Sequence, residues 1–359
     1  MFVSDNVSCV CPEVMRAIDV ANKGDAVSYG GDETTHELET AFSNYYEKPV
    51  CAFPVGTGTA ANALALALAT PRFRAIYCHE NAHIETTECG ATEAWGGGTK
   101  LVLLRGEHYR IDADDLKSAL ARLPSGDRPQ MAMPAVVSIS QGTEIGTIYS
   151  PDQIAAISHL AHDHGLLMHM DGARFSNALV KSGCTPADMT WRVGIDILSY
   201  GATKNGGMCA EAVVIFNPNL VAQQRFLRRR TGQLFSKMRY LSAQLTALIR
   251  NGVAERNALQ ANEMAARLAE GLSRIPGSRL LDRVDINEIF IFLPEVAAER
   301  LKASGYEIKL RIDGNGPHYR FVTAWNSAAA DIDQFVAVAA GDELRGRPVG
   351  RVQTEFRNR

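Results

Sequence analysis

Seven short apolar runs alternate along the chain with segments patterned as helices, and this alternation constrains the fold more than any other feature. The runs are apolar throughout rather than at every second residue. Such strands belong to a mostly parallel sheet that helices cover on both faces. The runs are VCAFPV from Val50, AIYC from Ala75, KLVLL from Lys100, AVVSIS from Ala135, LLMHMD from Leu166, DILSY from Asp196 and EAVVIF from Glu211. We therefore predict an α/β fold with a mostly parallel seven-stranded sheet between helices.

The pattern changes after the last of these runs. A long helical tract extends from Leu220 to about Leu272, and it is interrupted near Gly252, which is predicted to cap a helix C-terminus. Three short strand patterns follow, EIFIFL, YEIKLRI and YRFVTAW, and then a helix that begins near Asp331. We predict a large domain over residues 1–250, a smaller α+β domain over 251–345 and a frayed tail over 346–359.

The composition excludes several classes of protein. Of the 359 residues, 46% are apolar and 21% are charged, which is typical of globular rather than disordered or fibrous chains. The 37 basic and 40 acidic residues nearly balance, so we expect no nucleic-acid partner and no attraction to a membrane surface. The longest apolar run is too short to cross a bilayer, and the N-terminus lacks the pattern of a signal peptide. Seven scattered cysteines favour buried thiols in the cytoplasm over a disulfide framework.

A glycine-rich turn follows the first predicted strand. Gly56-Thr57-Gly58-Thr59-Ala60-Ala61 leads into a helix, and the free N–H groups at a helix N-terminus bind phosphate. The same turn fits the dinucleotide pattern G-x-G-x-x-A, with Glu80 where a ribose-binding acid could lie. An NAD-dependent oxidoreductase is therefore one hypothesis, and an ordinary strand–turn–helix junction is the alternative without a function.

The segment His79-Glu80-Asn81-Ala82-His83 matches the zinc-binding pattern H-E-x-x-H. It directly follows a predicted strand instead of lying inside a helix, and no third ligand follows in a second motif. A zinc hydrolase is therefore a remote alternative, and we expect no metal.

A third group of residues carries more specific chemistry. Asp171-Gly172-Ala173-Arg174 ends one predicted strand, and Lys204 follows the next strand among small residues. A lysine that is partly removed from water becomes a nucleophile for a carbonyl. A carboxylate beside it and a phosphate-binding turn nearby meet the needs of pyridoxal phosphate. The alternatives without a function are a surface lysine and a salt bridge between Asp171 and Arg174. Each explains one of the two segments alone, but they do not explain why both segments occur together with the glycine-rich turn.

Together these motifs resemble the L-threonine aldolases, which are fold-type-I pyridoxal phosphate enzymes of the aspartate aminotransferase superfamily. The similarity spans nearly the whole chain: SDN from Ser4, YGGDETTHELE from Tyr29, TGTAAN from Thr57, AHIETTECGA from Ala82, HMDGAR from His169, the Lys204 segment, SKMR from Ser236 and YRFVT from Tyr319. The resemblance implies a lyase that cleaves L-threonine, L-allo-threonine or phenylserine-like substrates to glycine and an aldehyde. It also implies a homotetramer, a dimer of dimers with active sites at the dimer interface. A phenylserine aldolase and a β-eliminating lyase or racemase are the alternatives on the same cofactor.

The resemblance implies a role for each matching residue. Lys204 would form the Schiff base, Asp171 would keep the pyridine nitrogen protonated, and His83 would stack on the ring. The phosphate would be bound by Thr57, Gly58, Thr59 and Arg239 of a neighbouring subunit. The substrate carboxylate would be bound by Ser4, Arg174 and Arg320, and Tyr29 would act at the subunit interface.

Two of these roles have equally good structural alternatives. Arg239 also fits a solvated face that continues the basic cluster from Arg225 to Arg230. Tyr29 also fits a packed surface aromatic.

One segment departs from the family pattern. Many relatives carry Thr-His-Asn after the fourth predicted strand, where this chain reads SISQGTEIG. Ser140, Gln141 and Thr143 stand where a second histidine could act as base. His83 or a bound water is then left to accept the β-hydroxyl proton, and geometry must decide between them.

Overall fold

The computed structural model describes residues 2–342, except 125 and 127. Its large sheet has seven strands in the order β1-β7-β6-β5-β4-β2-β3. The strands are β1 (Cys51–Val55), β2 (Ala75–His79), β3 (Lys100–Leu104), β4 (Pro134–Ser140), β5 (Leu167–Gly172), β6 (Ile197–Gly201) and β7 (Glu211–Ile215). Only β7 runs antiparallel to its neighbours in this sheet. The predicted mostly parallel sheet is confirmed, with a strand at each of the seven apolar runs.

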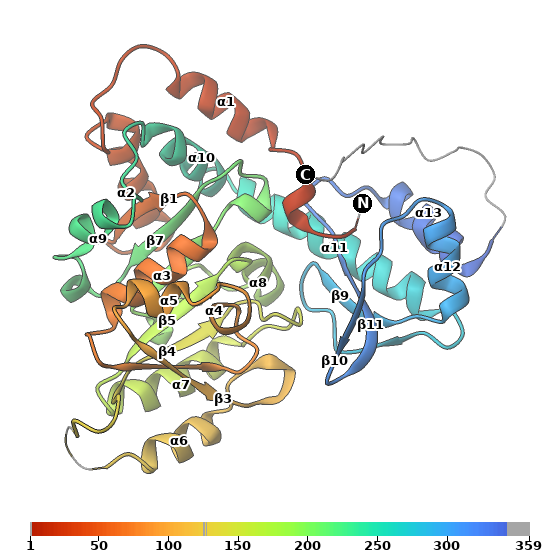
Figure 1. Ribbon diagram of the computed structural model, residues 1–359. Coiled ribbons are helices and arrows are strands. Elements are labelled where there is room, and N and C mark those ends of the chain that lie inside the picture. Colours follow the sequence, from red (N-terminus) through yellow and green to blue (C-terminus); the bar gives the residue numbers. More distant parts are fainter. Residues whose placement is uncertain (1, 125, 127, 343–359) are drawn as a thin grey trace, which may run out of the picture.

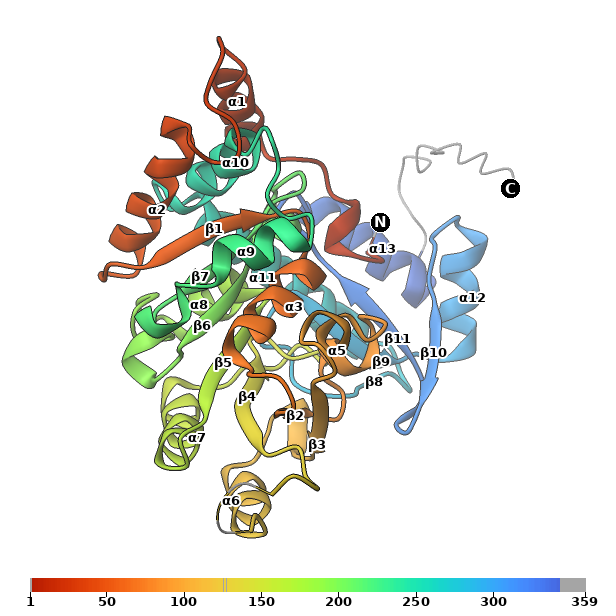
Figure 2. The same ribbon diagram turned by 60° about the vertical axis from the view of Figure 1, so that its left-hand side comes forward.

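Successive residues of the central strands pack on opposite faces of the large sheet. Val136, Ile197 and Val213 belong to the apolar cluster under α3 (Gly58–Ala69) and α5 (Ala91–Trp95). Their neighbours Val137, Leu198 and Val214 belong to the cluster under α7 (Pro151–Asp163) and α8 (Phe175–Ser182). Figure 2 shows the two helix layers with the sheet between them. Both faces are buried, which is why the strands are apolar throughout.

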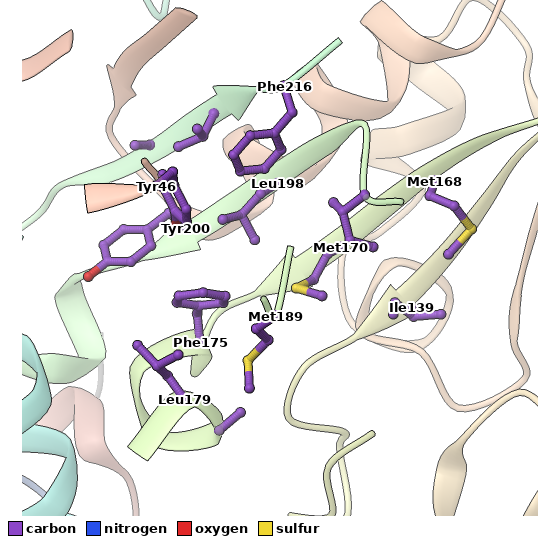
Figure 3. Packing of buried hydrophobic residues seen from close by; sticks show 14 of the residues in the cluster. Tyr46, Ile139, Met168, Met170, Phe175, Leu179, Met189, Leu198, Tyr200 and Phe216 are labelled. Atoms are coloured by element: carbon purple, nitrogen blue, oxygen red, sulfur yellow. The ribbon is translucent and has the colours of Figure 1, made fainter. Parts of the chain in front are cut away.

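Aromatic packing on the α8 face supports the strand ends (Figure 3). The Tyr46 ring meets the Phe216 ring edge-on at 5.0 Å and the Phe175 ring at 6.1 Å, and Phe175 lies 5.9 Å from the Tyr200 ring. Tyr200 is in β6, and Phe175 begins the helix that follows β5. This packing therefore holds the ends of β5 and β6, from which Asp171 and Lys204 project.

The remaining helical elements around the large sheet are α1 (Pro12–Ala21), α2 (Glu33–Tyr45), α4 (His83–Thr86), α6 (Ala113–Ala121), α9 (Gln224–Arg230) and α10 (Arg239–Ile249). Short 3-10 turns occur at η1 (Asp5–Val7), η2 (Glu107–Tyr109), η3 (Trp191–Val193), η4 (Thr203–Asn205) and η5 (Pro218–Leu220).

A smaller α+β region follows, as predicted. Its antiparallel sheet has the order β10-β11-β9-β8, with β8 (Arg279–Leu280), β9 (Glu288–Phe292), β10 (Leu310–Asp313) and β11 (Gly316–Val322). Two helices pack on it, α12 (Glu295–Ala303) and α13 (Ala329–Ala340). The long helix α11 (Val253–Ser273) joins the two regions (Figure 1), because Val253 packs in the large core and Leu268 in the small one.

Two details differ from the predictions. Gly252 does not cap α10: Arg250 is the C-cap there, and Gly252, with φ 68°, precedes α11. Asn251 also has a positive φ, so the turn uses two left-handed residues and the glycine serves the following helix. The thiols of Cys9, Cys89 and Cys209 are exposed rather than buried, and all seven cysteines are free.

The predicted domain boundary at residue 250 stays a prediction. Phe2 packs in the core of the smaller region, and its carbonyl accepts a hydrogen bond from the Val322 N–H at 2.9 Å. The N-terminal segment therefore contributes to both regions. The predicted tail over 346–359 lies outside the described residues. In the described part of the chain, no helix has the length and apolar character needed to span a membrane.

Candidate active site

Two neighbouring cavities lie beyond the carboxyl ends of the parallel strands. The first has a volume of about 390 Å³ and is lined by Thr57, Gly58, Thr59, Asn62, Asp171 and Glu211, among others. The second, of about 450 Å³, is lined by Ser4, Glu144, Arg174, Glu288 and Arg320, among others. Asn6, His83 and Lys204 line both cavities. A ligand in the first cavity can therefore contact a ligand in the second at these residues.

One end of the first cavity is the N-terminus of α3. The Thr57 hydroxyl caps this helix by accepting a hydrogen bond from the Ala60 N–H at 3.1 Å. The N–H groups of Gly58 and Thr59 lie in the first turn, where a helix provides no acceptor for them. A Cβ on Gly58 would meet no heavy atom within 4 Å, so the backbone faces open space. This end of the cavity suits a phosphate group.

A chain of hydrogen bonds fixes the buried wall of the first cavity. Asp171 is 6% exposed, and its carboxylate accepts hydrogen bonds from the Ala173 N–H at 3.0 Å and from the Asn62 amide at 2.8 Å. The Asn62 amide also donates to Glu88 at 2.8 Å. Glu88 in turn contacts His83 Nδ1 at 2.7 Å. The hydrogen bond to Glu88 raises the pKa of His83, while burial of the ring acts in the opposite direction.

Lys204 lies in η4, immediately beyond β6. The positive charge of Arg174 lowers the pKa of the Lys204 amine, and burial lowers it further, while the Asp5 carboxylate opposes both. The Ala202 N–H donates to the buried Glu211 carboxylate at 2.6 Å, which holds the turn before the lysine. A lowered pKa leaves more of the amine neutral and able to attack a carbonyl.

Two arginines in the second cavity contact the same buried carboxylate. Glu288 lies 3.0 Å from Arg174 Nη1 and accepts a hydrogen bond from Arg320 Nε at 2.9 Å. Arg174 also donates to both carboxylate oxygens of Asp5, at 2.9 and 3.1 Å. Asp5 comes from the N-terminal segment, Arg174 follows β5, and the other two residues belong to the small sheet. The second cavity is therefore built from three parts of the chain.

The comparisons with known proteins agree with this geometry. A family model described as beta-eliminating lyase matches residues 2–295. The low specificity L-threonine aldolase of a Pseudomonas species is 38% identical, over 94% of this chain and 96% of that protein. The low specificity L-threonine aldolase of Pseudomonas aeruginosa is also 38% identical, over 91% of this chain and 93% of that protein.

The chain belongs to the beta-eliminating lyase family. Among solved structures, the Leishmania major threonine aldolase superposes with a TM-score of 0.87 at 28% identity, covering 94% of this lyase and 98% of that chain. A serine palmitoyltransferase that carries pyridoxal phosphate superposes with a TM-score of 0.70 at 18% identity, covering 95% of this chain and 86% of that one, and shows the shared fold. The resemblance and the fold class predicted from the motifs are confirmed.

The structure brings together most of the residues predicted for the site of this lyase. The first cavity contains Thr57, Gly58, Thr59, His83, Asp171 and Lys204, and the second contains Ser4, Arg174 and Arg320. Arg239 and Tyr29 line neither cavity. Arg239 begins α10 and contacts Tyr240, while the Tyr29 side chain is 47% exposed beside Arg229. Their roles in the site stay predictions that require a second subunit.

The segment that departs from the family pattern holds a residue that sequence reasoning missed. Gln141 bonds the backbone of Tyr149, and Thr143 bonds Thr147, so neither side chain lines a cavity. Glu144 lines the second cavity instead, and Ser140 donates a hydrogen bond to it at 2.8 Å. Asn62 and Glu88 were missed as well, although both lie inside the motifs TGTAAN and AHIETTECGA.

The geometry does not favour the zinc and NAD hypotheses. His79 stacks on Tyr109 and bonds backbone groups through both ring nitrogens. Within residues 2–342, apart from 125 and 127, the cluster with the spacing of metal ligands comprises His83, Glu88 and Asp171, without His79. Glu80 pairs with Arg105 at 3.2 Å outside both cavities, so it lies away from any ribose near the α3 N-terminus.

Proposed function

We propose that this lyase cleaves L-threonine, L-allo-threonine and related L-β-hydroxy-α-amino acids such as phenylserine to glycine and an aldehyde, with pyridoxal phosphate as its cofactor. One observation carries the proposal: Asp171, Lys204 and the N-terminus of α3 line a single cavity, which meets a second cavity that contains Arg174 and Arg320. The names of the relatives at 38% identity support the same substrate class.

The first cavity fits the cofactor in volume and chemistry. Its 390 Å³ falls within the range of about 300–1,000 Å³ that is usual for small-molecule sites. Thr57, Gly58 and Thr59 would hold the phosphate at the helix N-terminus. The buried Asp171 carboxylate would accept a hydrogen bond from the pyridine nitrogen and favour its protonated form. When bound, pyridoxal phosphate supplies an aldehyde that captures an amine and a ring that withdraws the electron pair released at Cα.

The residues around the ring would hold and orient the reacting groups. The neutral amine of Lys204 would attach the cofactor, and His83, which lines both cavities, would cover one face of the ring. Arg174 and Arg320 would bind the substrate carboxylate, with the Ser4 hydroxyl beside them. The substrate carboxylate would share these guanidinium groups with Glu288, which contacts both in the structure. Holding the substrate at both ends sets the direction of the Cα–Cβ bond and lowers the entropic part of the barrier.

We also propose that the protein is a cytoplasmic homotetramer, arranged as a dimer of dimers. The seven free cysteines suit a reducing compartment. A site that lacks Arg239 within its own chain suits an interface at which a neighbouring subunit supplies this residue.

Product analysis tests the proposed function. The purified protein is mixed with pyridoxal phosphate and L-threonine, L-allo-threonine or phenylserine, and the products are followed by NMR. We expect glycine together with acetaldehyde or benzaldehyde. The Lys204→Ala variant should form neither product, while Lys181→Ala, which changes an exposed lysine of α8, should match the wild type.

A different product would support the second candidate. The description of the family model favours β-elimination, which would convert threonine to 2-oxobutanoate and ammonium. Racemisation would give D-configured amino acids. Either product, formed without glycine, would contradict the aldolase proposal but would still agree with a pyridoxal phosphate site.

A further inference from the structure

A partly buried carboxyl group in the wall of the second cavity has no role in the function described so far. Glu144 follows β4, and its Oε1 accepts hydrogen bonds from the His83 N–H and the Ser140 hydroxyl, each at 2.8 Å. Its Oε2 is buried and has no hydrogen-bond partner among the described residues. An unpaired carboxylate oxygen away from water is unfavourable, so the carboxyl group gains from a further proton or donor.

The surroundings of Glu144 allow it to exchange a proton near neutral pH. Burial, with the negative charge of Asp171, raises the pKa of Glu144 to about 7. The hydrogen bonds from Ser140 and His83 act in the opposite direction. The other titratable or charged groups that interact with Glu144 come from different elements: Cys78 in β2, Tyr109 in η2, Tyr149 before α7 and Arg174 before α8. A carboxyl group with this pKa suits general acid–base catalysis.

Three other titratable groups of the second cavity, His83, His318 and Glu288, are less suited to accept a proton. The hydrogen bond to Glu88 raises the pKa of His83 and occupies its Nδ1 at 2.7 Å. His318 is 1% exposed, and its Nδ1 contacts the Gly316 carbonyl at 3.0 Å. Glu288 is held between Arg174 and Arg320, which the substrate carboxylate would also contact. Glu144 therefore stands out as the acceptor next to His83 and Lys204.

We infer that Glu144 is the catalytic base that takes the β-hydroxyl proton from the substrate, an inference that rests on the proposed aldolase function. The hydroxyl proton moves to the Glu144 carboxylate, and the electron pair of the O–H bond forms the carbonyl of the aldehyde. The Cα–Cβ bond breaks, and its electron pair passes to Cα, where pyridoxal phosphate held by Lys204 and Asp171 would stabilise the negative charge. Cα then takes up one proton to give glycine. One proton is lost and one is gained, so no other reactant is consumed.

The Glu144→Gln variant separates this role from a structural one. Glutamine keeps the size of the side chain and an oxygen for the His83 N–H, but it cannot take up a proton. We expect kcat for L-threonine cleavage to fall by about 100- to 10,000-fold. Exchange of the glycine Cα proton with deuterium, followed by NMR, needs no base at a hydroxyl and should persist within about threefold of wild type. Glu80→Gln, outside both cavities, should leave both rates unchanged.

The pH dependence and the protein's own spectrum provide two further readouts. For the wild type, kcat should fall as the pH drops below about 7, because protonated Glu144 cannot accept the proton. Ser140→Ala removes a hydrogen-bond donor that favours the Glu144 carboxylate, so the fall in kcat should begin at a higher pH in this variant. Infrared titration of the protein without cofactor should show the carbonyl band of protonated carboxyl groups, and Glu144→Gln should lose the part of this band that titrates near pH 7.

The outcomes distinguish this inference from the proposed function. Cleavage by Glu144→Gln within about threefold of the wild-type rate would overturn the inference, and so would a parallel loss of glycine exchange, which indicates a structural role. Failure of the proposed function would appear in the wild type itself, which would form no glycine and aldehyde from threonine. That result would overturn the inference as well.

Discussion

The charged residues of the site are placed so that each carboxylate has a donor or a cation against it. The Asn62 amide lies between Asp171 and Glu88 and donates to both, which keeps two buried carboxylates close together without direct contact. Two carboxylates in direct contact would repel, and one would take up a proton. The amide therefore connects Asp171, which lines the first cavity, to Glu88, which contacts His83.

Glu144 should make the stability of the protein depend on pH. Its pKa is about 7 in the folded chain, against an ordinary value of 4.5. Between these values the folded chain holds a proton that the unfolded chain has released, so the free energy of unfolding falls as the pH rises from about 4.5 to about 7. The loss should reach about 1–3 kcal/mol, since one pKa unit corresponds to about 1.36 kcal/mol.

Urea unfolding of the wild type and Glu144→Gln across this pH range measures the effect. Glutamine does not titrate, so the variant should gain stability relative to the wild type as the pH rises through the window. The relative stability should level off above about pH 7. A difference in free energy of unfolding that does not change with pH would contradict the assigned pKa.

Among the single residues of the site, the sequence predicted those in motifs at the ends of strands, such as Lys204, Asp171 and His83. It did not predict Glu144, because QGTE does not reveal which side chain faces the cavity. In the structure, the side chains of Gln141 and Thr143 form hydrogen bonds within the loop, whereas the side chain of Glu144 lines the second cavity. Its environment is set by residues far away in the chain, which no local pattern contains.

At the scale of elements, the site depends on how closely the ends of β5 and β6 approach. A Cβ on Gly201 would collide with the backbone of Ala173, which follows Asp171. Gly172 has a similar restriction, because a Cβ there would lie 2.9 Å from the Ser199 carbonyl. Small residues at these strand ends therefore bring Asp171 and Lys204 to the same cavity.

The Gly201→Ala variant tests this close approach. We expect it to lower the free energy of unfolding by about 1–3 kcal/mol, the usual cost of overpacking, and to weaken cofactor binding because the two strand ends move apart. Gly314→Ala is a matched control, since a Cβ there meets nothing within 4 Å and the residue is exposed. Urea unfolding and titration with pyridoxal phosphate measure both effects. Equal stability and cofactor affinity in the two variants would contradict the argument.

The sheet could be predicted because strands that are buried on both faces must be apolar throughout. Its edge strand β3 also has an apolar run, although most of its residues are exposed or half-buried. The turn between α10 and α11 was predicted incorrectly, because Asn251 and Gly252 both adopt left-handed conformations and the helix boundary depends on their geometry. Burial on two faces leaves a strong signal in sequence, whereas the choice of which helix a glycine caps does not.

At the scale of the whole molecule, the site is assembled from distant parts of the chain. Asp5 of the N-terminal segment, Arg174 of the large region and Glu288 of the small sheet meet in one ion-pair network. Figure 1 shows the N-terminal segment beside the junction of the two regions. Of these three residues, the sequence motifs assigned only Arg174 to the site. They could not predict the pairing, because it joins segments almost 300 residues apart.

Mixing two inactive variants tests whether a second subunit completes the site. Lys204→Ala lacks the proposed nucleophile, and Arg239→Ala lacks the predicted phosphate ligand. If Arg239 acts across an interface, hybrid dimers contain one site with both residues, and a randomised equal mixture should regain up to roughly a quarter of wild-type activity. Activity that stays at the level of the separate variants, while hybrids are detected by native mass spectrometry, would place Arg239 outside the neighbouring site.

The central claim is that Lys204 carries pyridoxal phosphate in the cavity it shares with Asp171. Reduction of the cofactor-loaded protein with borohydride, followed by digestion and mass spectrometry of the peptides, tests it most directly. The account predicts one pyridoxyl group for each chain, attached to Lys204 and absent from the Lys204→Ala variant. Labelling of a different lysine, or unchanged labelling of the variant, would contradict the account.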